Sequence, residues 1–181
     1  MPKEAVQPTG VERTFGAEEI IVSKTDLKGI ITYANDIFLR VSGYREEDVV
    51  GQPHSLIRHP QMPRAVFRLL WNEIEAGREV FAYVLNLASD GAQYWVLAHV
   101  TPSFGPDNRI IGYHSNRRSP QIAAVERVKQ TYELLRIEEE RHTNVRSAAD
   151  AGYSAMLALL AHQEQTYSQY VWSLIHDGRP E

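Results

Sequence analysis

The sequence predicts an α+β fold, in which a five-stranded antiparallel sheet carries helices on one face and is followed by a helical extension. Short β-branched runs come first, short helical segments follow them, and three further strand-like runs come next. The dipeptide Asp90-Gly91 separates two of these later runs and is a strong signal for a tight hairpin. Strands and helices that are grouped along the chain, rather than alternating, favour this class of fold.

The first two strands are expected at residues 19–23 and 29–34, where isoleucine, valine and threonine are concentrated. Asp26 and Gly29 lie in the connection between them, as is typical of a hairpin turn. Residues 1–17 contain two prolines and few large apolar side chains. We therefore predict a flexible N-terminal arm before the first strand.

Three helical segments are expected after the second strand. Asn35 is a good N-cap for a short helix that ends at Gly43. Acidic residues then open a second short helix that ends at Gly51. Pro63 precedes the longest segment, residues 64–77, in which the apolar side chains share one face.

The last three strands are expected at residues 80–89, 93–104 and 109–116. The first two pair around the Asp-Gly turn, and a Gly-Pro-Asp-Asn sequence provides the turn before the third. These runs complete the predicted sheet.

A helical tail is expected from Ser119-Pro120 onward, because apolar residues recur there every three or four positions. A polar stretch at residues 136–152 interrupts this pattern. One bent helix and two helices, at roughly 120–142 and 147–176, therefore fit equally well.

The chain accordingly divides into an arm at residues 1–17, a core domain at 18–119 and a helical tail at 120–181. A tail with an apolar stripe needs something to cover that stripe. We therefore expect the tail to self-associate or to bind a partner.

The composition excludes several classes of function. The net charge is −4 and lysine and arginine form no long run, which argues against nucleic-acid binding. The absence of cysteine excludes disulfides, a thiolate nucleophile and cysteine-ligated metals, and it fits a cytoplasmic protein. No apolar run approaches the ~20 residues of a membrane span, so we expect no direct membrane insertion. Common catalytic motifs are also missing, and we expect that the chain is not an enzyme.

The stretch LIRHPQMP, residues 56–63, contains two prolines that restrict their own backbone and that of the residues before them. Such a loop is stiff and presents Arg58 and His59 at its centre. It could hold a ligand, or its prolines could simply end one helix and begin the next.

Several motifs occur together in a fixed order. They are ANDIF at residues 34–38, SGY at 42–44, GQPHSLIRHPQMP at 51–63 and YWV at 94–96. With these motifs the chain resembles the PAS domain of Aer-type aerotaxis receptors and of related bacterial redox-sensing proteins. The resemblance runs from about Glu19 to Val128.

The resemblance implies a soluble PAS sensor that holds a flavin, usually FAD, non-covalently between the sheet and the helices. The flavin would report the redox or energy state of the cell, and the tail would pass the signal to a second copy of the chain or to a separate chemoreceptor-like transducer. Tyr94 and Trp95 are neighbours on one expected strand, and because side chains alternate along a strand only one of them can face the cavity. By resemblance, the cofactor-binding residues are Arg58, His59, Asn35, Asn86, Tyr94 and Trp95.

Two alternatives remain open. The first is a cofactor-free PAS module for dimerisation or docking. It is suggested by three departures from the family pattern: Gln61 replaces an aspartate, Val80 replaces a tryptophan, and Leu87 replaces part of a basic motif. His99 and His114 lie on expected strands and could bind haem iron in a PAS gas sensor. FMN is a further possible cofactor. A flavin–cysteine adduct, as formed in LOV-type light sensors, is excluded because the chain has no cysteine.

Overall fold

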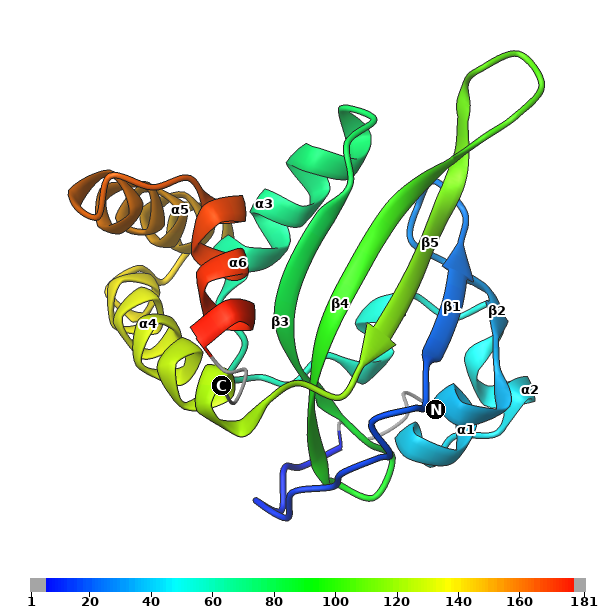
Figure 1. Cartoon of the computed structure of the whole chain (residues 1–181). Coiled ribbons are helices and arrows are strands. Elements are labelled where there is room, and N and C mark those ends of the chain that lie inside the picture. Colours follow the sequence, from blue (N-terminus) through cyan, green and yellow to red (C-terminus); the bar gives the residue numbers. More distant parts are fainter. Residues whose placement is uncertain (1–5, 178–181) are drawn as a thin grey trace.

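The structure is a computed structural model that describes residues 6–177 (Figure 1). A five-stranded antiparallel sheet has the strand order β2-β1-β5-β4-β3. The strands are β1 (Ile21–Thr25), β2 (Ile31–Ala34), β3 (Val80–Leu87), β4 (Gln93–Phe104) and β5 (Ile110–Arg118). Between β2 and β3 lie α1 (Asp36–Ser42), α2 (Glu46–Val49), the 3-10 helix η1 (His54–Ile57) and α3 (Arg64–Glu75). The tail forms α4 (Ile122–Glu140), α5 (Val145–His162) and α6 (Tyr167–Asp177).

The predicted α+β fold is confirmed, and the sheet has two differently used faces. Asn86 pairs with Tyr94 and Ala98 with Arg117, so these four side chains point to the same face, which we call the inner face. Helices η1 and α3 lie over this face. On the outer face, the Tyr132 hydroxyl of α4 donates a hydrogen bond of 2.7 Å to the carbonyl of Tyr83 in β3.

The tail consists of three helices rather than one or two. Asn144 begins α5, because its Oδ1 accepts hydrogen bonds from the backbone N–H groups of Arg146 and Ser147. A second break follows His162, where Glu164 has a left-handed φ of 53°. The three helices gather beside β3 at one edge of the sheet (Figure 1). The tail therefore folds back onto the core domain.

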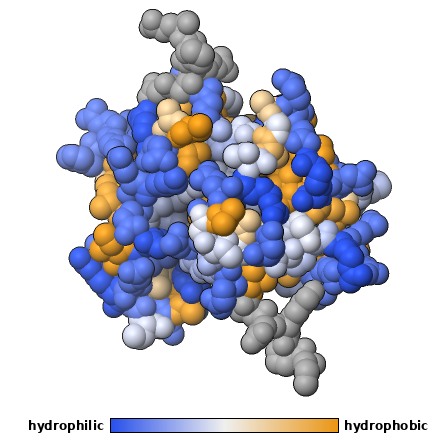
Figure 2. Space-filling model, turned by 90° about the horizontal axis from the view of Figure 1, so that it is seen from below, coloured by the Kyte–Doolittle hydropathy of each residue, from blue (hydrophilic) through white to orange (hydrophobic). Residues whose placement is uncertain are grey.

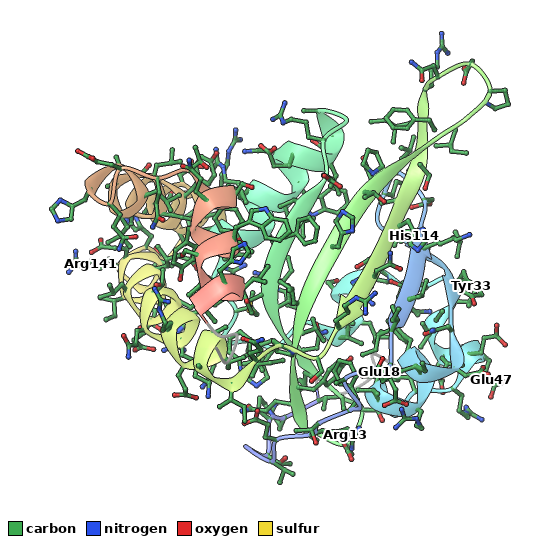
Figure 3. All side chains as sticks on the ribbon, in the orientation of Figure 1. Arg13, Glu18, Tyr33, Glu47, His114 and Arg141 are labelled. Atoms are coloured by element: carbon green, nitrogen blue, oxygen red, sulfur yellow. The ribbon has the colours of Figure 1, made fainter. Side chains whose placement is uncertain are left out.

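The segment before β1 lies against the β3–β4 hairpin. The Thr9 N–H donates to the Gly91 carbonyl at 2.9 Å, and Val11 and Arg13 exchange backbone hydrogen bonds with Gln93. Arg13 lies beside the turn of this hairpin (Figure 3), where its guanidinium pairs with Asp90. We expected a flexible arm over residues 1–17; residues 9–13 instead pair along the hairpin edge, and residues 1–5 lie outside the described residues.

No helix within residues 6–177 is both long enough and apolar enough to cross a bilayer.

Asn35 connects α1 to the sheet. Its Oδ1 accepts hydrogen bonds from the N–H groups of Phe38 and Val22, both at 3.0 Å, and its Nδ2 donates to the Ile20 carbonyl at 2.8 Å. The side chain is thus both the N-cap of α1 and a support for the start of β1.

We predict that Asn35→Ala lowers the free energy of unfolding by about 2 kcal/mol, because one cap and two partly buried backbone groups lose their partner. Urea unfolding of the full chain measures this loss. Asn116→Ala is the control, since the Asn116 side chain makes no hydrogen bond within residues 6–177. Equal losses for the two variants would contradict the structural role of Asn35.

Candidate functional site

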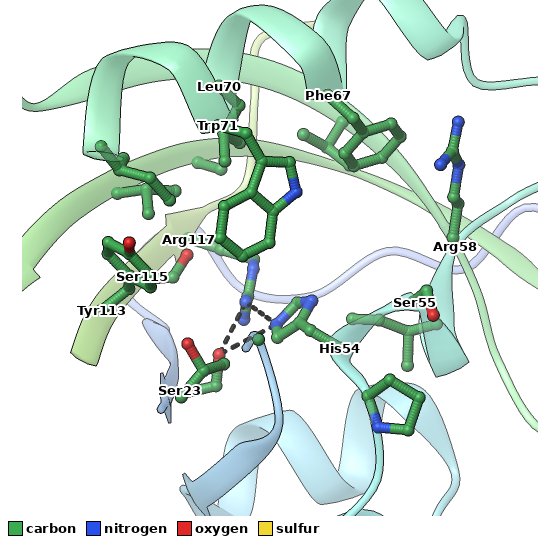
Figure 4. Close-up of a pocket in the computed structure, with 18 of the residues that line it drawn as sticks. Ser23, His54, Ser55, Arg58, Phe67, Leu70, Trp71, Tyr113, Ser115 and Arg117 are labelled. Carbon is green, nitrogen blue, oxygen red and sulfur yellow. Dashed lines mark hydrogen bonds between the residues drawn. The ribbon is translucent and has the colours of Figure 1, made fainter. Parts of the chain in front are cut away.

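A cavity of about 310 Å³ lies between the inner face of the sheet and helices η1 and α3 (Figure 4). This volume is at the lower end of the range of about 300–1,000 Å³ that is typical of small-molecule sites. Phe67, Leu70 and Trp71 of α3 form one wall, and Val84 and Val100 of the sheet form the opposite wall. The cavity therefore has two largely apolar walls.

Trp71 points from α3 into the cavity, toward His54 and Arg117 (Figure 4). Its ring lies edge-on to Tyr113, with 5.5 Å between the ring centroids. Gly29, in the β1–β2 turn, has a φ of 77°, and a Cβ there would lie 3.2 Å from the indole ring. Glycine at this position allows both the turn and its close approach to Trp71.

A polar cluster lies between the two walls. The Arg117 guanidinium donates a hydrogen bond of 2.7 Å to Ser23 Oγ and a second one to His54 Nε2. Ser23 Oγ and His54 Nε2 are 3.1 Å apart. The cluster joins β1, η1 and β5, as the dashed lines in Figure 4 show.

Arg117 is a buried cation without a carboxylate partner among the described residues. Only 3% of the residue is exposed, and burial lowers the pKa of its guanidinium to about 10, so it stays charged at neutral pH. Burial and the charge of Arg117 lower the pKa of His54 to about 3. His54 is therefore neutral, and its Nε2 is the acceptor for Arg117, which leaves the ring proton on Nδ1.

Three donors that line the cavity have no partner among the described residues. They are Asn86 Nδ2, Ser115 Oγ and Arg117 Nη1, and all three are buried. Leaving a buried polar group unpaired costs about 1–3 kcal/mol. The arrangement therefore suits a ligand that brings hydrogen-bond acceptors, and negative charge, to this part of the cavity.

The proline-rich loop borders the cavity through Arg58. The Arg58 guanidinium lies 4.0 Å from the centroid of the Phe67 ring, and a backbone bridge joins Arg58 to Asn86 of β3. Burial and the nearby charge of Arg64 lower the pKa of Arg58 to about 10, so this side chain is also a cation at neutral pH. His59 is buried, and its Nδ1 accepts a hydrogen bond of 3.1 Å from the Gln61 N–H. His59 thus shapes the loop.

The structure brings only part of the expected set to the cavity: Arg58 and Asn86 line it. Asn35 and His59 do not line the cavity. The Asn35 side chain bonds to α1 and to the start of β1, and His59 Nδ1 accepts from its own loop, while the buried His59 Nε2 has no partner among the described residues. Tyr94 is buried on the inner face without lining the cavity, and Trp95 packs on the outer face, 6.1 Å from Tyr132 between ring centroids.

The two histidines considered for haem differ in position. His99 stacks on Phe81, with ring centroids 4.1 Å apart, and its Nε2 lies 2.7 Å from Glu79, so it does not line the cavity. His114 is among the residues that line it, and its buried Nε2 has no partner among the described residues. This nitrogen donates or accepts according to the tautomer of the ring.

Sequence reasoning missed Ser23, His54, Ser115 and Arg117. One signal was present, since Tyr113, Ser115 and Arg117 alternate along one strand and so point to one face. It could not be used without knowing which face of that strand is inner.

Comparison with known proteins places this site in context. Over 109 residues, 59% of this chain, the sequence is 41% identical to an aerotaxis receptor of Escherichia coli (strain K12). That match spans 21% of the receptor, so the chain corresponds to about a fifth of its length.

Two solved structures share the fold. One is the light-state structure of the blue-light photoreceptor Aureochrome1 LOV, with a TM-score of 0.54 and 24% identity over 59% of this chain and 85% of that one. The other is the dark structure of the same photoreceptor domain, with a TM-score of 0.55 and 23% identity over 63% of this chain and 85% of that one.

A family model described as the PAS fold matches residues 19–115, which is more than half of the chain. The matched segment contains β1 to β4, the helices around the cavity and most of β5. The chain therefore belongs to the PAS family.

Proposed function

We propose that this PAS signalling domain holds a flavin non-covalently in the cavity and senses its redox state. The observation that carries the proposal is the buried Arg117 guanidinium, which has no carboxylate partner among the described residues and lies beside two further unpaired donors in an aromatic-walled cavity. The similarity to an aerotaxis receptor supports a redox or energy signal. Catalysis has no part in the proposal, and we place the sensing in the cytoplasm.

The residues present fit such a cofactor. Phe67 and Trp71 on one side and Val84 on the other suit a flat ring system. The edge of a flavin ring has carbonyl acceptors and an N–H donor. The Asn86 side chain can serve both, because an amide carries a donor and an acceptor.

Arg117 places a buried positive charge beside the cavity. A flavin supplies reversible uptake of electrons, and a fixed positive charge in a cavity of low polarity stabilises negative charge that develops nearby. Neutral His54 and Ser23 hold the guanidinium in place without neutralising it. A change in the ligand's charge would therefore alter the hydrogen bonding of Arg117.

Helix α3 offers a path from the cavity to the tail. Phe67, Leu70 and Trp71 of α3 line the cavity. On another side of the same helix, Arg68 forms an ion pair with Asp150 of α5, and its guanidinium lies 5.3 Å from the centroid of the Tyr153 ring. A shift of α3 would therefore change the contacts of Arg68 with α5.

The second contact on this path is a buried carboxylate. Glu139, near the end of α4, accepts hydrogen bonds of 2.9 Å from the N–H groups of Arg64 and Ala65 in the first turn of α3. Gly152 of α5 lies against Glu139, and a Cβ at Gly152 would be 2.4 Å from a Glu139 carboxylate oxygen. Glu139 thus joins α3, α4 and α5 at one point, directly after the proline-rich loop.

The tail is the proposed output surface, and the proposed partner is a second copy of this chain or a separate transducer. Six large apolar residues of the tail are exposed by 42–82% among the described residues: Ile122, Leu134, Ile137, Val145, Leu157 and Trp172. Figure 2 shows that, on the face seen from below, apolar surface is divided into separate patches among hydrophilic side chains. Rearrangement of the docked tail would change which of these surfaces a partner meets.

For ligand binding, we predict that the full chain binds FMN or FAD and that Arg117→Gln weakens this binding about 10–100-fold. A charge-assisted hydrogen bond is worth about 1.5–3 kcal/mol, which corresponds to that factor. Quenching of flavin fluorescence on titration with protein measures the affinity. The matched control is Arg118→Gln, which removes the exposed neighbouring arginine.

Two further variants, Asn86→Ala and Ser115→Ala, keep this test decisive if Arg117→Gln fails to fold. Each should weaken flavin binding, because each removes one of the unpaired donors. A chain that binds no flavin, or variants that bind as tightly as the Arg118→Gln control, would refute the proposal.

For tail docking, we predict that Glu139→Ala accelerates amide hydrogen exchange at Arg64 and Ala65 and destabilises the chain by about 2 kcal/mol, since two hydrogen bonds to a carboxylate are lost. NMR exchange rates and urea unfolding provide the two readouts. Glu138→Ala is the control, because the Glu138 carboxylate pairs with Arg141 at the surface. Unchanged exchange at Arg64 and Ala65 would show that Glu139 does not hold the first turn of α3.

A further inference from the structure

A second hollow of about 510 Å³ lies where the proline-rich loop meets the tail, and we call it the loop–tail groove. Pro60 and Met62 of the loop line it, as do Ala148 of α5 and residues around the end of α4. Ser55 and Arg58 line both this groove and the cavity under the sheet. The two spaces are therefore adjacent, with Arg58 at their border.

Three arginines are among the residues that line the loop–tail groove: Arg58, Arg64 and Arg136. The side chains of Arg58 and Arg64 make no hydrogen bond or ion pair within residues 6–177. Arg136 pairs with Glu133, three residues earlier on the same helix. Such a pair on a helix surface is weak and leaves the remaining donors of the guanidinium available.

Two carboxylates also line the groove, but they do not cancel this charge. Both oxygens of Glu139 are engaged by the backbone N–H groups at the start of α3. Glu140 is exposed to solvent, where its charge is screened. Arg58 and Arg64, which have no carboxylate partner within residues 6–177, are therefore the cations most available to an anionic ligand.

We propose that the loop–tail groove binds the phosphate-bearing end of the flavin nucleotide whose ring occupies the cavity, with Arg136 of the tail as one of its ligands. This inference rests on the proposed function. Guanidinium groups bind phosphate through paired hydrogen bonds, and Arg58 is placed to contact a ligand that passes from one space into the other. The core domain alone would then lack part of the binding site.

A consequence follows for signalling. A nucleotide that contacts both the loop and α4 would hold the tail against the core domain. By linkage, the docked tail would raise nucleotide affinity by the same factor by which the nucleotide favours docking. Riboflavin, which has no phosphate, would bind without this effect.

The test compares the affinities of riboflavin, FMN and FAD for the full chain and for Arg136→Gln. We expect FMN or FAD to bind at least about tenfold more tightly than riboflavin to the unaltered chain, as a charge-assisted phosphate contact provides. Arg136→Gln should reduce that ratio severalfold while leaving riboflavin affinity unchanged. The separate FMN and FAD measurements show whether a single phosphate is enough.

Arg141→Gln is the matched control. Arg141 also pairs with a glutamate three residues earlier, but it does not line the groove, and it points away from the core in Figure 3. If riboflavin binds as tightly as both nucleotides, or if Arg136→Gln and Arg141→Gln behave alike, the inference fails while the flavin proposal stands. If none of the three flavins binds, both fail.

Discussion

The packing around the cavity depends on the Arg117 guanidinium, which is buried without a carboxylate partner among the described residues. Burying a charge is expensive unless it is hydrogen-bonded. Arg117 meets this requirement only in part, through Ser23 and neutral His54. These contacts fix the position of η1 against β1 and β5 and so set the floor of the cavity. The guanidinium nitrogen left over points to a ligand as the missing partner.

Helix α3 contacts both the cavity and the tail. One side of it lines the cavity, and another side contacts α5 through Arg68. Its first turn has no capping side chain of its own, since Pro63 precedes it, and Glu139 of the tail supplies the acceptors instead. Because the cap comes from the tail, a displacement of α3 would also disturb the contacts that hold the tail.

Much of the fold could be predicted from local patterns, whereas the site depended on long-range register. Hairpin and capping signals at Asp90-Gly91 and Asn35 act over a few residues and identified the correct elements. The break after His162 was missed, because Glu164 adopts a left-handed conformation that sequence rarely signals outside glycine. Arg117 was missed because its burial depends on pairing β5 with both β1 and β4. Arg58 and Asn86 came from the family resemblance, and their ligand role remains a prediction.

In the proposed mechanism, the redox state of a ligand in the cavity changes how the tail is docked. Hydrogen exchange of the flavin-loaded chain, oxidised and chemically reduced, tests it most directly, with flavin-free chain and the same reductant as the control. We expect reduction to change hydrogen exchange in the first turn of α3 and along α5, with no such change in the control. Identical exchange in these helices, despite full reduction of the bound flavin, would contradict it.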